Sequence, residues 1–163
     1  MATTVGEYIK RDHDDFRLIF AWLRKSTVET AALREEVYPF LVARVHAHAV
    51  AEEATIFPQM ERTPELLADT LALIAGHRGM DMLADDLAGT PLTARLWESK
   101  LVPLLDLTSC HLSREEADVF PRATCHFTQE ALEAAGEEFE RVLQREWQIA
   151  GVHGGLPPAM RGR

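Results

Sequence analysis

Residues 48–58 read HAVAEEATIFP, and residues 111–121 read HLSREEADVFP. The pattern H-x-x-x-E-E-A-x-x-F-P therefore occurs twice, 63 positions apart. A lone histidine precedes each copy at nearly the same distance: His13 lies 35 positions before the first copy, and His77 lies 34 positions before the second. The chain thus consists of two copies of one unit, and a repeat of this kind constrains the architecture before any other feature is considered.

Each copy of the motif places a histidine and a glutamate one helical turn apart. Residues i and i+4 share a face of an α-helix, so His48 points the same way as Glu52, and His111 the same way as Glu115. With the two upstream histidines, four inward imidazoles and two inward carboxylates match a dinuclear metal site in a helical bundle. Each metal would take two imidazoles, and the two glutamates can bridge. A single H-x-x-x-E is usually a surface pair, but chance does not readily repeat a whole constellation.

Apolar residues recur at helical spacing over five stretches of the chain. Thr4 and Glu7 form a capping-box pattern at the start of the first stretch, and Gly151 stops the last. Pro39 interrupts the second stretch, either as a kink or as the start of its core-spanning part; Pro103 occupies the equivalent place in the second repeat. The helices are expected over residues 4 to 24–27, 30–57, 63–88, 92–122 and 129–149.

This pattern predicts an all-α fold: an antiparallel up-down-up-down four-helix bundle with an additional C-terminal helix. We expect one helical domain over residues 1–151. The glycine pair and the proline pair within residues 152–163 are typical of a flexible C-terminal tail. No glycine-rich nucleotide-binding motif and no second domain are evident in the sequence.

These motifs resemble those of the hemerythrin-like (HHE) proteins over about residues 5–125. The resemblance rests on Asp12-His13-Asp14, on His77, and on the doubled motif with its Glu-Glu and Phe-Pro pairs. It implies a four-helix bundle that holds a non-haem di-iron centre, with two Fe ions bridged by an oxo or hydroxo group. Mn or Zn can also occupy such a ligand set. Matched by motif, the imidazole ligands are His13, His48, His77 and His111, and the bridging carboxylates are Glu52 and Glu115.

Asp81 departs from the oxygen-carrier pattern of that family. Oxygen-carrying hemerythrins have a second histidine one turn after the histidine of the third helix, and here Asp81 follows His77 by four. This difference argues against reversible oxygen carriage. Asp81 is expected to face the core, either as a carboxylate ligand of the metal held by His77 and His111 or as the partner of Arg17 across the bundle. The remaining alternative is an exposed charge.

Composition limits the partners and the compartment. The 163 residues include 17 Lys+Arg and 26 Asp+Glu, so the net charge is −9, which disfavours nucleic acid or an anionic membrane as a partner. The sequence shows no apolar run long enough to span a bilayer and no signal-peptide pattern. Two cysteines are too few for a disulfide scaffold, so we expect a cytoplasmic protein in which Cys110 is a buried core thiol. The sequence does not indicate an oligomeric state.

Three functions are compatible with these residues. The first is a di-iron protein that binds or reacts with a small diatomic or peroxide ligand, and the resemblance implies O₂ sensing, NO or peroxide handling, or iron handling without choosing among them. The second is an enzyme that activates oxygen to act on an organic substrate. The third is an interaction module in which the metals are structural. Open coordination positions favour the first two functions, and saturated metals favour the third.

Overall fold

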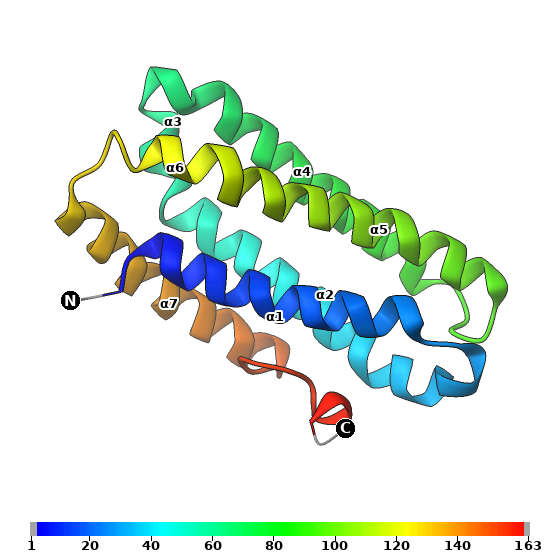
Figure 1. The fold of residues 1–163 in the computed structure, drawn as a ribbon. Helices are drawn as coiled ribbons and strands as arrows, with labels where there is room; N and C mark the ends of the chain where they lie inside the picture. Colours follow the sequence, from blue (N-terminus) through cyan, green and yellow to red (C-terminus); the bar gives the residue numbers. More distant parts are fainter. Residues whose placement is uncertain (1–2, 162–163) are drawn as a thin grey trace.

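The computed structural model describes residues 3–161 and consists of long antiparallel helices (Figure 1). No strand occurs in the described part of the chain, which confirms the all-α prediction of a four-helix bundle with one more C-terminal helix. The long helices of the bundle are α1 (Val5–Lys25), α2 (Ala31–Ala54), α4 (Pro64–Ala88) and α5 (Arg95–Arg114). The other elements are η1 (Val28–Thr30), α3 (Phe57–Glu61), the π-helical η2 (Glu115–Val119), α6 (Phe120–Ala123), α7 (Gln129–Ala150) and η3 (Pro158–Met160).

The helix ends follow from local chemistry. Thr4 and Glu7 form the expected capping box, in which the Glu7 carboxylate accepts from the Thr4 backbone N–H at 2.7 Å. The Thr128 hydroxyl accepts from the Ala131 backbone N–H at 3.2 Å and caps α7. Gly151 ends α7 in the left-handed conformation, with φ 67°, which a side chain would disfavour. The sequence therefore places these boundaries correctly.

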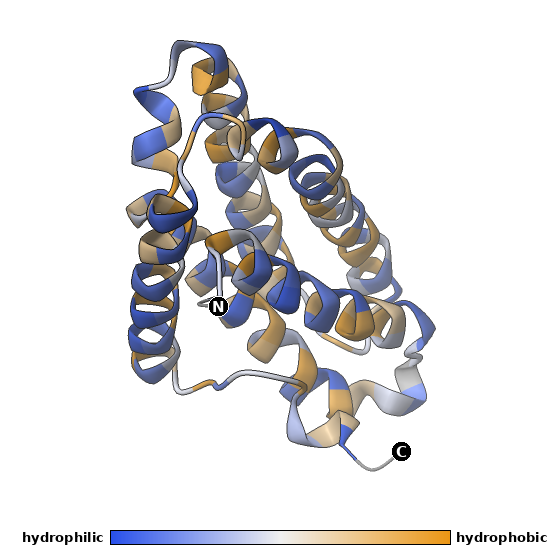
Figure 2. Cartoon of the chain, turned by 60° about the vertical axis from the view of Figure 1, so that its left-hand side comes forward, coloured by the Kyte–Doolittle hydropathy of each residue, from blue (hydrophilic) through white to orange (hydrophobic). Residues whose placement is uncertain are grey.

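α7 packs against α1 and α2 on the outside of the four-helix bundle (Figure 1). Its buried face carries Leu132, Phe139, Leu143 and Trp147, as its periodicity predicts. Polar and apolar residues alternate around the helices, as in amphipathic packing (Figure 2). Within residues 3–161, no helix combines the length and the apolar character needed to cross a membrane.

The apolar core divides into two clusters along the bundle axis. One contains Val5 and Ile9, which precede His13 in α1, and the other contains Phe16 and the apolar residues that follow it. α4 is divided in the same way at His77. α2 changes from one cluster to the other between Leu41 and Ala47, just before His48, and the α5–η2 segment changes between Leu112 and Val119, just after His111. The motif histidines therefore lie where the two clusters meet. Packing on both sides fixes a polar layer across the middle of the bundle.

Pro39 and Pro103 lie inside α2 and α5, so each helix continues across its proline. The fourth predicted helix is also not uniform, because five residues from Glu115 form the π-helical η2. A π-helical turn widens the spacing of side chains along a helix and is frequent at functional sites. The motif copies therefore differ locally: Glu52 lies in the last turn of α2, whereas Glu115 begins a π-helical segment.

The interpretation of Cys110 as a buried core thiol is wrong. Cys110 is exposed, because the buried face of α5 passes through Thr108, His111 and Leu112.

The segment after α7 lies against the bundle. The backbone carbonyl of Gly155 accepts from Arg44 of α2 at 2.6 Å, and the Ala159 backbone N–H donates to Glu36 at 2.8 Å. Leu156 and Met160 pack on the apolar cluster beside them. These contacts favour treating residues 152–161 as part of the folded unit, so the expected division into a domain and a flexible tail at residue 151 stays a prediction.

Candidate metal centre

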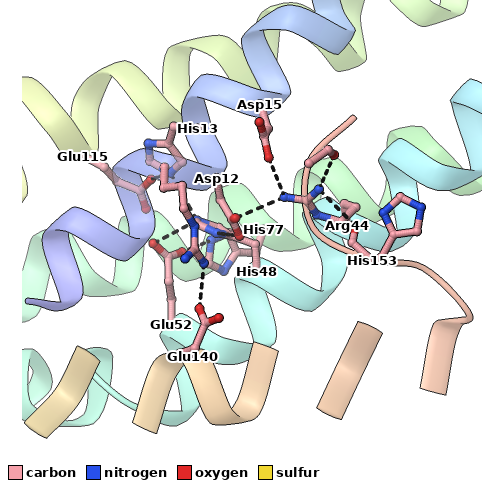
Figure 3. A network of polar contacts seen from close by, with 12 residues as sticks. Asp12, His13, Asp15, Arg44, His48, Glu52, His77, Glu115, Glu140 and His153 are labelled. Atoms are coloured by element: carbon pink, nitrogen blue, oxygen red, sulfur yellow. Dashed lines mark hydrogen bonds and ion pairs between the residues drawn. The ribbon is translucent and has the colours of Figure 1, made fainter. Parts of the chain in front are cut away.

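Six of the seven predicted site residues meet in the layer between the two apolar clusters. They form two overlapping groups that share Glu52 and Glu115, and within each group one ligand atom from every residue lies within 4.8 Å of the others. All six side chains are buried (Figure 3 shows five of them). The first group adds His13 and His48 to the shared glutamates, and the second adds His77 and His111.

Each glutamate has one oxygen beside each histidine pair. Glu52 places Oε1 3.3 Å from His48 Nε2 and Oε2 3.2 Å from His77 Nε2. Glu115 places Oε1 2.9 Å from His111 Nε2 and Oε2 3.4 Å from His13 Nε2. The α2 and η2 carboxylates therefore span the two pairs, as bridging ligands of two metals do.

The polar atoms at the centre are not satisfied by the protein. Both oxygens of Glu52, both oxygens of Glu115 and Nε2 of His111 are buried and have no hydrogen-bond partner among the described residues. Leaving such groups unpaired is costly, and carboxylates most of all. Nε2 of His13 and Nε2 of His48 also lie only 3.1 Å apart and point at each other. A donor set of imidazole nitrogens and carboxylate oxygens that converges in this way fits first-row metal ions.

The outer nitrogens of three histidine rings are held by carboxylates. His13 Nδ1 lies 2.8 Å from Glu116, and His77 Nδ1 lies 2.8 Å from Glu53. These glutamates are the second members of the repeated Glu-Glu pairs, and each one orients the lone histidine of the other repeat. A carboxylate on one ring nitrogen leaves the other free to bind metal and makes it more basic.

Asp12 orients His48. Its Oδ2 lies 3.2 Å from His48 Nδ1, although Asp12 is the sequence neighbour of His13. The contact crosses the α1–α2 interface and does not involve the neighbouring His13 ring. On the other side of His48, the Phe139 ring of α7 makes an edge contact, with centroids 5.5 Å apart.

The pKa values of the metal-free layer favour a proton on His48 and not on His13. Burial, and then the charge of His48, lowers the pKa of His13 well below its usual value. Burial also acts against protonation of His48, but the Glu52 and Asp12 carboxylates outweigh it and raise the pKa of His48 to about 10. Burial, with the Glu52 charge, raises the pKa of Glu115. One cation between His13 and His48 thus partly compensates the buried carboxylates, and a metal ion would replace that proton.

Asp81 does not join the layer, so both core-facing expectations for it are wrong. Its side chain is 46% exposed and lies 3.4 Å from the exposed His46 ring. Arg17 pairs instead with Asp14 and Glu116. The reason lies in the spacing of the buried face of α4, which alternates between three and four residues, so the inward position after His77 is three residues on. That face carries Leu66, Thr70, Leu73, His77, Met80, Ala84 and Leu87.

Comparison with known proteins agrees with this geometry. A family model described as Hemerythrin HHE cation binding domain matches residues 4–123. The chain belongs to this family. The match confirms the resemblance and ends before α7, so the C-terminal helix and the segment after it lie outside the matched residues. Comparisons with curated proteins and with solved structures found no match.

Proposed function

We propose that this hemerythrin-like chain is a non-haem di-iron protein that binds or reacts with a small ligand such as O₂, NO or peroxide. The observation that carries the proposal is the arrangement of Glu52 and Glu115, each of which has one oxygen beside each histidine pair. His13 and His48 would hold one iron, His77 and His111 the other, and both glutamates would bridge. The net charge of −9 disfavours nucleic acid or an anionic membrane as its partner, and the two cysteines, too few for a disulfide scaffold, favour the cytoplasm as its compartment.

The ligand count supports reactivity with a small molecule. Two imidazoles and one oxygen from each bridging carboxylate give each iron about four protein ligands, whereas octahedral iron accepts six. Bound iron with open positions supplies coordination and redox chemistry to a small ligand. Glu53, Glu116 and Asp12 hold the rings of His77, His13 and His48 in place for that purpose.

The shape of the interior favours a ligand of diatomic size over an organic substrate. A narrow, mainly apolar cavity of about 20 Å³ is lined by Val45, Met80 and Thr108, each one helical turn from a motif histidine. That volume suits about one or two water-sized molecules. A larger open cavity of about 510 Å³ lies between α2 and α4, and none of the six candidate ligands lines either cavity. Space for a substrate is therefore separate from the metal layer.

Metal analysis combined with visible spectroscopy tests the proposal. The full chain is loaded anaerobically with ferrous iron, and spectra are recorded before and after exposure to O₂, NO and H₂O₂. We expect about two irons per chain and a spectral change with at least one of the three ligands. A protein that binds iron but responds to none of them would favour the structural-module alternative. A colourless protein that retains zinc and excludes iron would contradict the di-iron assignment.

A further inference from the structure

The two halves of the chain differ where they support the metal layer. In the first half, Asp12 and Asp15 of α1 face Arg44 of α2 (Figure 3). The equivalent positions in the second repeat, 64, 64 and 63 residues later, are Gly76, Gly79 and Leu107. A charged cluster in which Asp12 and Arg44 are buried is therefore replaced by two glycines and a leucine in the other half.

In the first half, Arg44 connects the C-terminal segment to a candidate ligand. Its side chain is fully buried, and its Nη2 donates to Asp12 Oδ1 at 3.1 Å and to Asp15 Oδ2 at 3.3 Å. Its Nη1 donates to the backbone carbonyls of Gly155 at 2.6 Å and His153 at 3.2 Å, beyond α7. The other oxygen of Asp12 contacts His48 Nδ1. A continuous chain of polar contacts thus runs from the C-terminal segment through Arg44 and Asp12 to His48.

The ring of Trp147 at the end of α7 completes the enclosure of Arg44, since its centroid lies 4.6 Å from the guanidinium carbon. Trp147, His153 and Gly155 all lie beyond position 123, where the match to the hemerythrin-like family model ends. The C-terminal helix and segment therefore keep water away from the Asp12–Arg44 pair, and a buried pair interacts more strongly than an exposed one.

In the second half, the position equivalent to Asp12 is Gly76, which has no side chain to offer the His111 ring. A Cβ atom added at Gly76 would lie 2.6 Å from His111 Nδ1, so no side chain fits at the position equivalent to Asp12. A Cβ atom at Gly79 would lie 3.2 Å from the end of Leu107. The glycines bring α4 close to α5, and the His111 ring packs against backbone where His48 meets a carboxylate.

We infer that the two metal positions have unequal affinities, and that the C-terminal segment, acting through Arg44 and Asp12, raises the affinity of the His13–His48 position. Both histidines of that position have a carboxylate on Nδ1, whereas in the other position only His77 has one among residues 3–161. Loss of such a carboxylate partner typically weakens metal binding by about 10–100-fold. Arg44 and Asp12 are positioning residues, and the inference rests on the proposed metal site.

A titration of the metal-free full chain with Co²⁺, in competition with a chelator and followed by visible absorption, tests the inference. We expect two binding steps whose dissociation constants differ by about 10–100-fold. His111→Ala should retain the tighter step, and His48→Ala only the weaker one. Asp12→Asn, which keeps the shape and removes the charge, should weaken the tighter step by at least about tenfold and leave the weaker step unchanged.

Arg44→Lys and Arg34→Lys form a matched pair of variants. Both arginines are buried in α2, but Arg34 contacts Ser26, Leu92 and Glu98 at the far end of the bundle. We expect Arg44→Lys to weaken the tighter step only, because an ammonium cannot hold the two carboxylates and two carbonyls together. Arg34→Lys should alter thermal stability and neither Co²⁺ affinity.

Three results would overturn the inference. Equal affinities for the two steps in the parent protein would remove the asymmetry. An Arg34→Lys variant that weakens Co²⁺ binding as much as Arg44→Lys would reduce the role of Arg44 to general stability, and an Asp12→Asn variant with parental affinity would exclude the relay to His48. Failure of the parent chain to bind any Co²⁺ would instead contradict the proposed metal site, and the inference with it.

Discussion

Replacing Gly76 by alanine should empty one metal position without removing any ligand. The added Cβ atom would lie 2.6 Å from His111 Nδ1, about 0.8 Å short of the 3.4 Å at which ordinary contact begins. The ring or the helix must therefore move by on the order of 0.8 Å, whereas metal–ligand distances tolerate changes of only about 0.2 Å. We expect the His77–His111 position to lose its metal, so that the content falls from about two irons per chain to about one.

Metal analysis of Gly76→Ala after anaerobic iron loading measures this loss. The matched control is Gly79→Ala, one turn along the same helix, where the new Cβ atom would meet only the flexible end of Leu107 at 3.2 Å. Alanine favours the helix over glycine by about 1 kcal/mol in both variants. A difference in iron content between them would therefore not come from helix propensity. Two irons bound to Gly76→Ala with parental affinity would refute the placement of His111 as a ligand.

Three further perturbations address the layer. Changing both Glu52 and Glu115 to alanine should remove at least one iron and the metal-dependent stabilisation, about 2.7 kcal/mol at roughly 100 times the Kd; full iron content in metal analysis would contradict the bridging assignment. Asp81→His, in contrast, should leave the iron spectrum and the O₂ response unchanged, because Asp81 lies outside the layer. Between pH 7 and 9, metal affinity should rise by up to about tenfold per pH unit, since metal must displace the proton that His48 retains up to a pKa of about 10. The same proton contributes stability to the metal-free protein that is complete below about pH 6.5 and is lost as pH rises through 10; calorimetry that detects no proton release on metal binding would contradict this account.

The helices and the composition of the layer could be predicted because they depend on local rules repeated twice. A histidine and a glutamate four residues apart share a helical face, and the duplicate motif supplies the second pair. The structure accordingly brings His13, His48, His77 and His111 together with the glutamates, and the family match confirms the resemblance on which the ligand set was based.

The features that could not be predicted depend on contacts between helices. On an isolated helix Asp81 would share a face with His77, but the buried face of α4 continues from His77 to Met80. Asp12 orients the histidine of the neighbouring helix rather than its own neighbour in sequence. In the sequence, Glu53 and Glu116 are recognisable only as the repeated second glutamate of each motif. The histidine that each one contacts depends on the register between helices. A one-residue difference in such a register redirects a side chain by about 100°.

The contacts of the C-terminal segment could not be predicted from local sequence either. Its glycine and proline pairs are typical of a flexible tail, and no local signal marks its carbonyls as partners of Arg44. The fully buried guanidinium needs acceptors, and α1 alone does not supply enough of them. The contact is therefore dictated by an unsatisfied group on α2, far away in the sequence.

The central claim is that two metals lie between the four histidines and are bridged by Glu52 and Glu115. A crystal structure of the iron-loaded full chain, with an anomalous difference map recorded at the iron edge, tests it most directly. The account predicts two peaks per chain, one beside Nε2 of His13 and His48 and one beside Nε2 of His77 and His111, each in contact with one oxygen of both glutamates. A single peak, or peaks outside the layer, would contradict it.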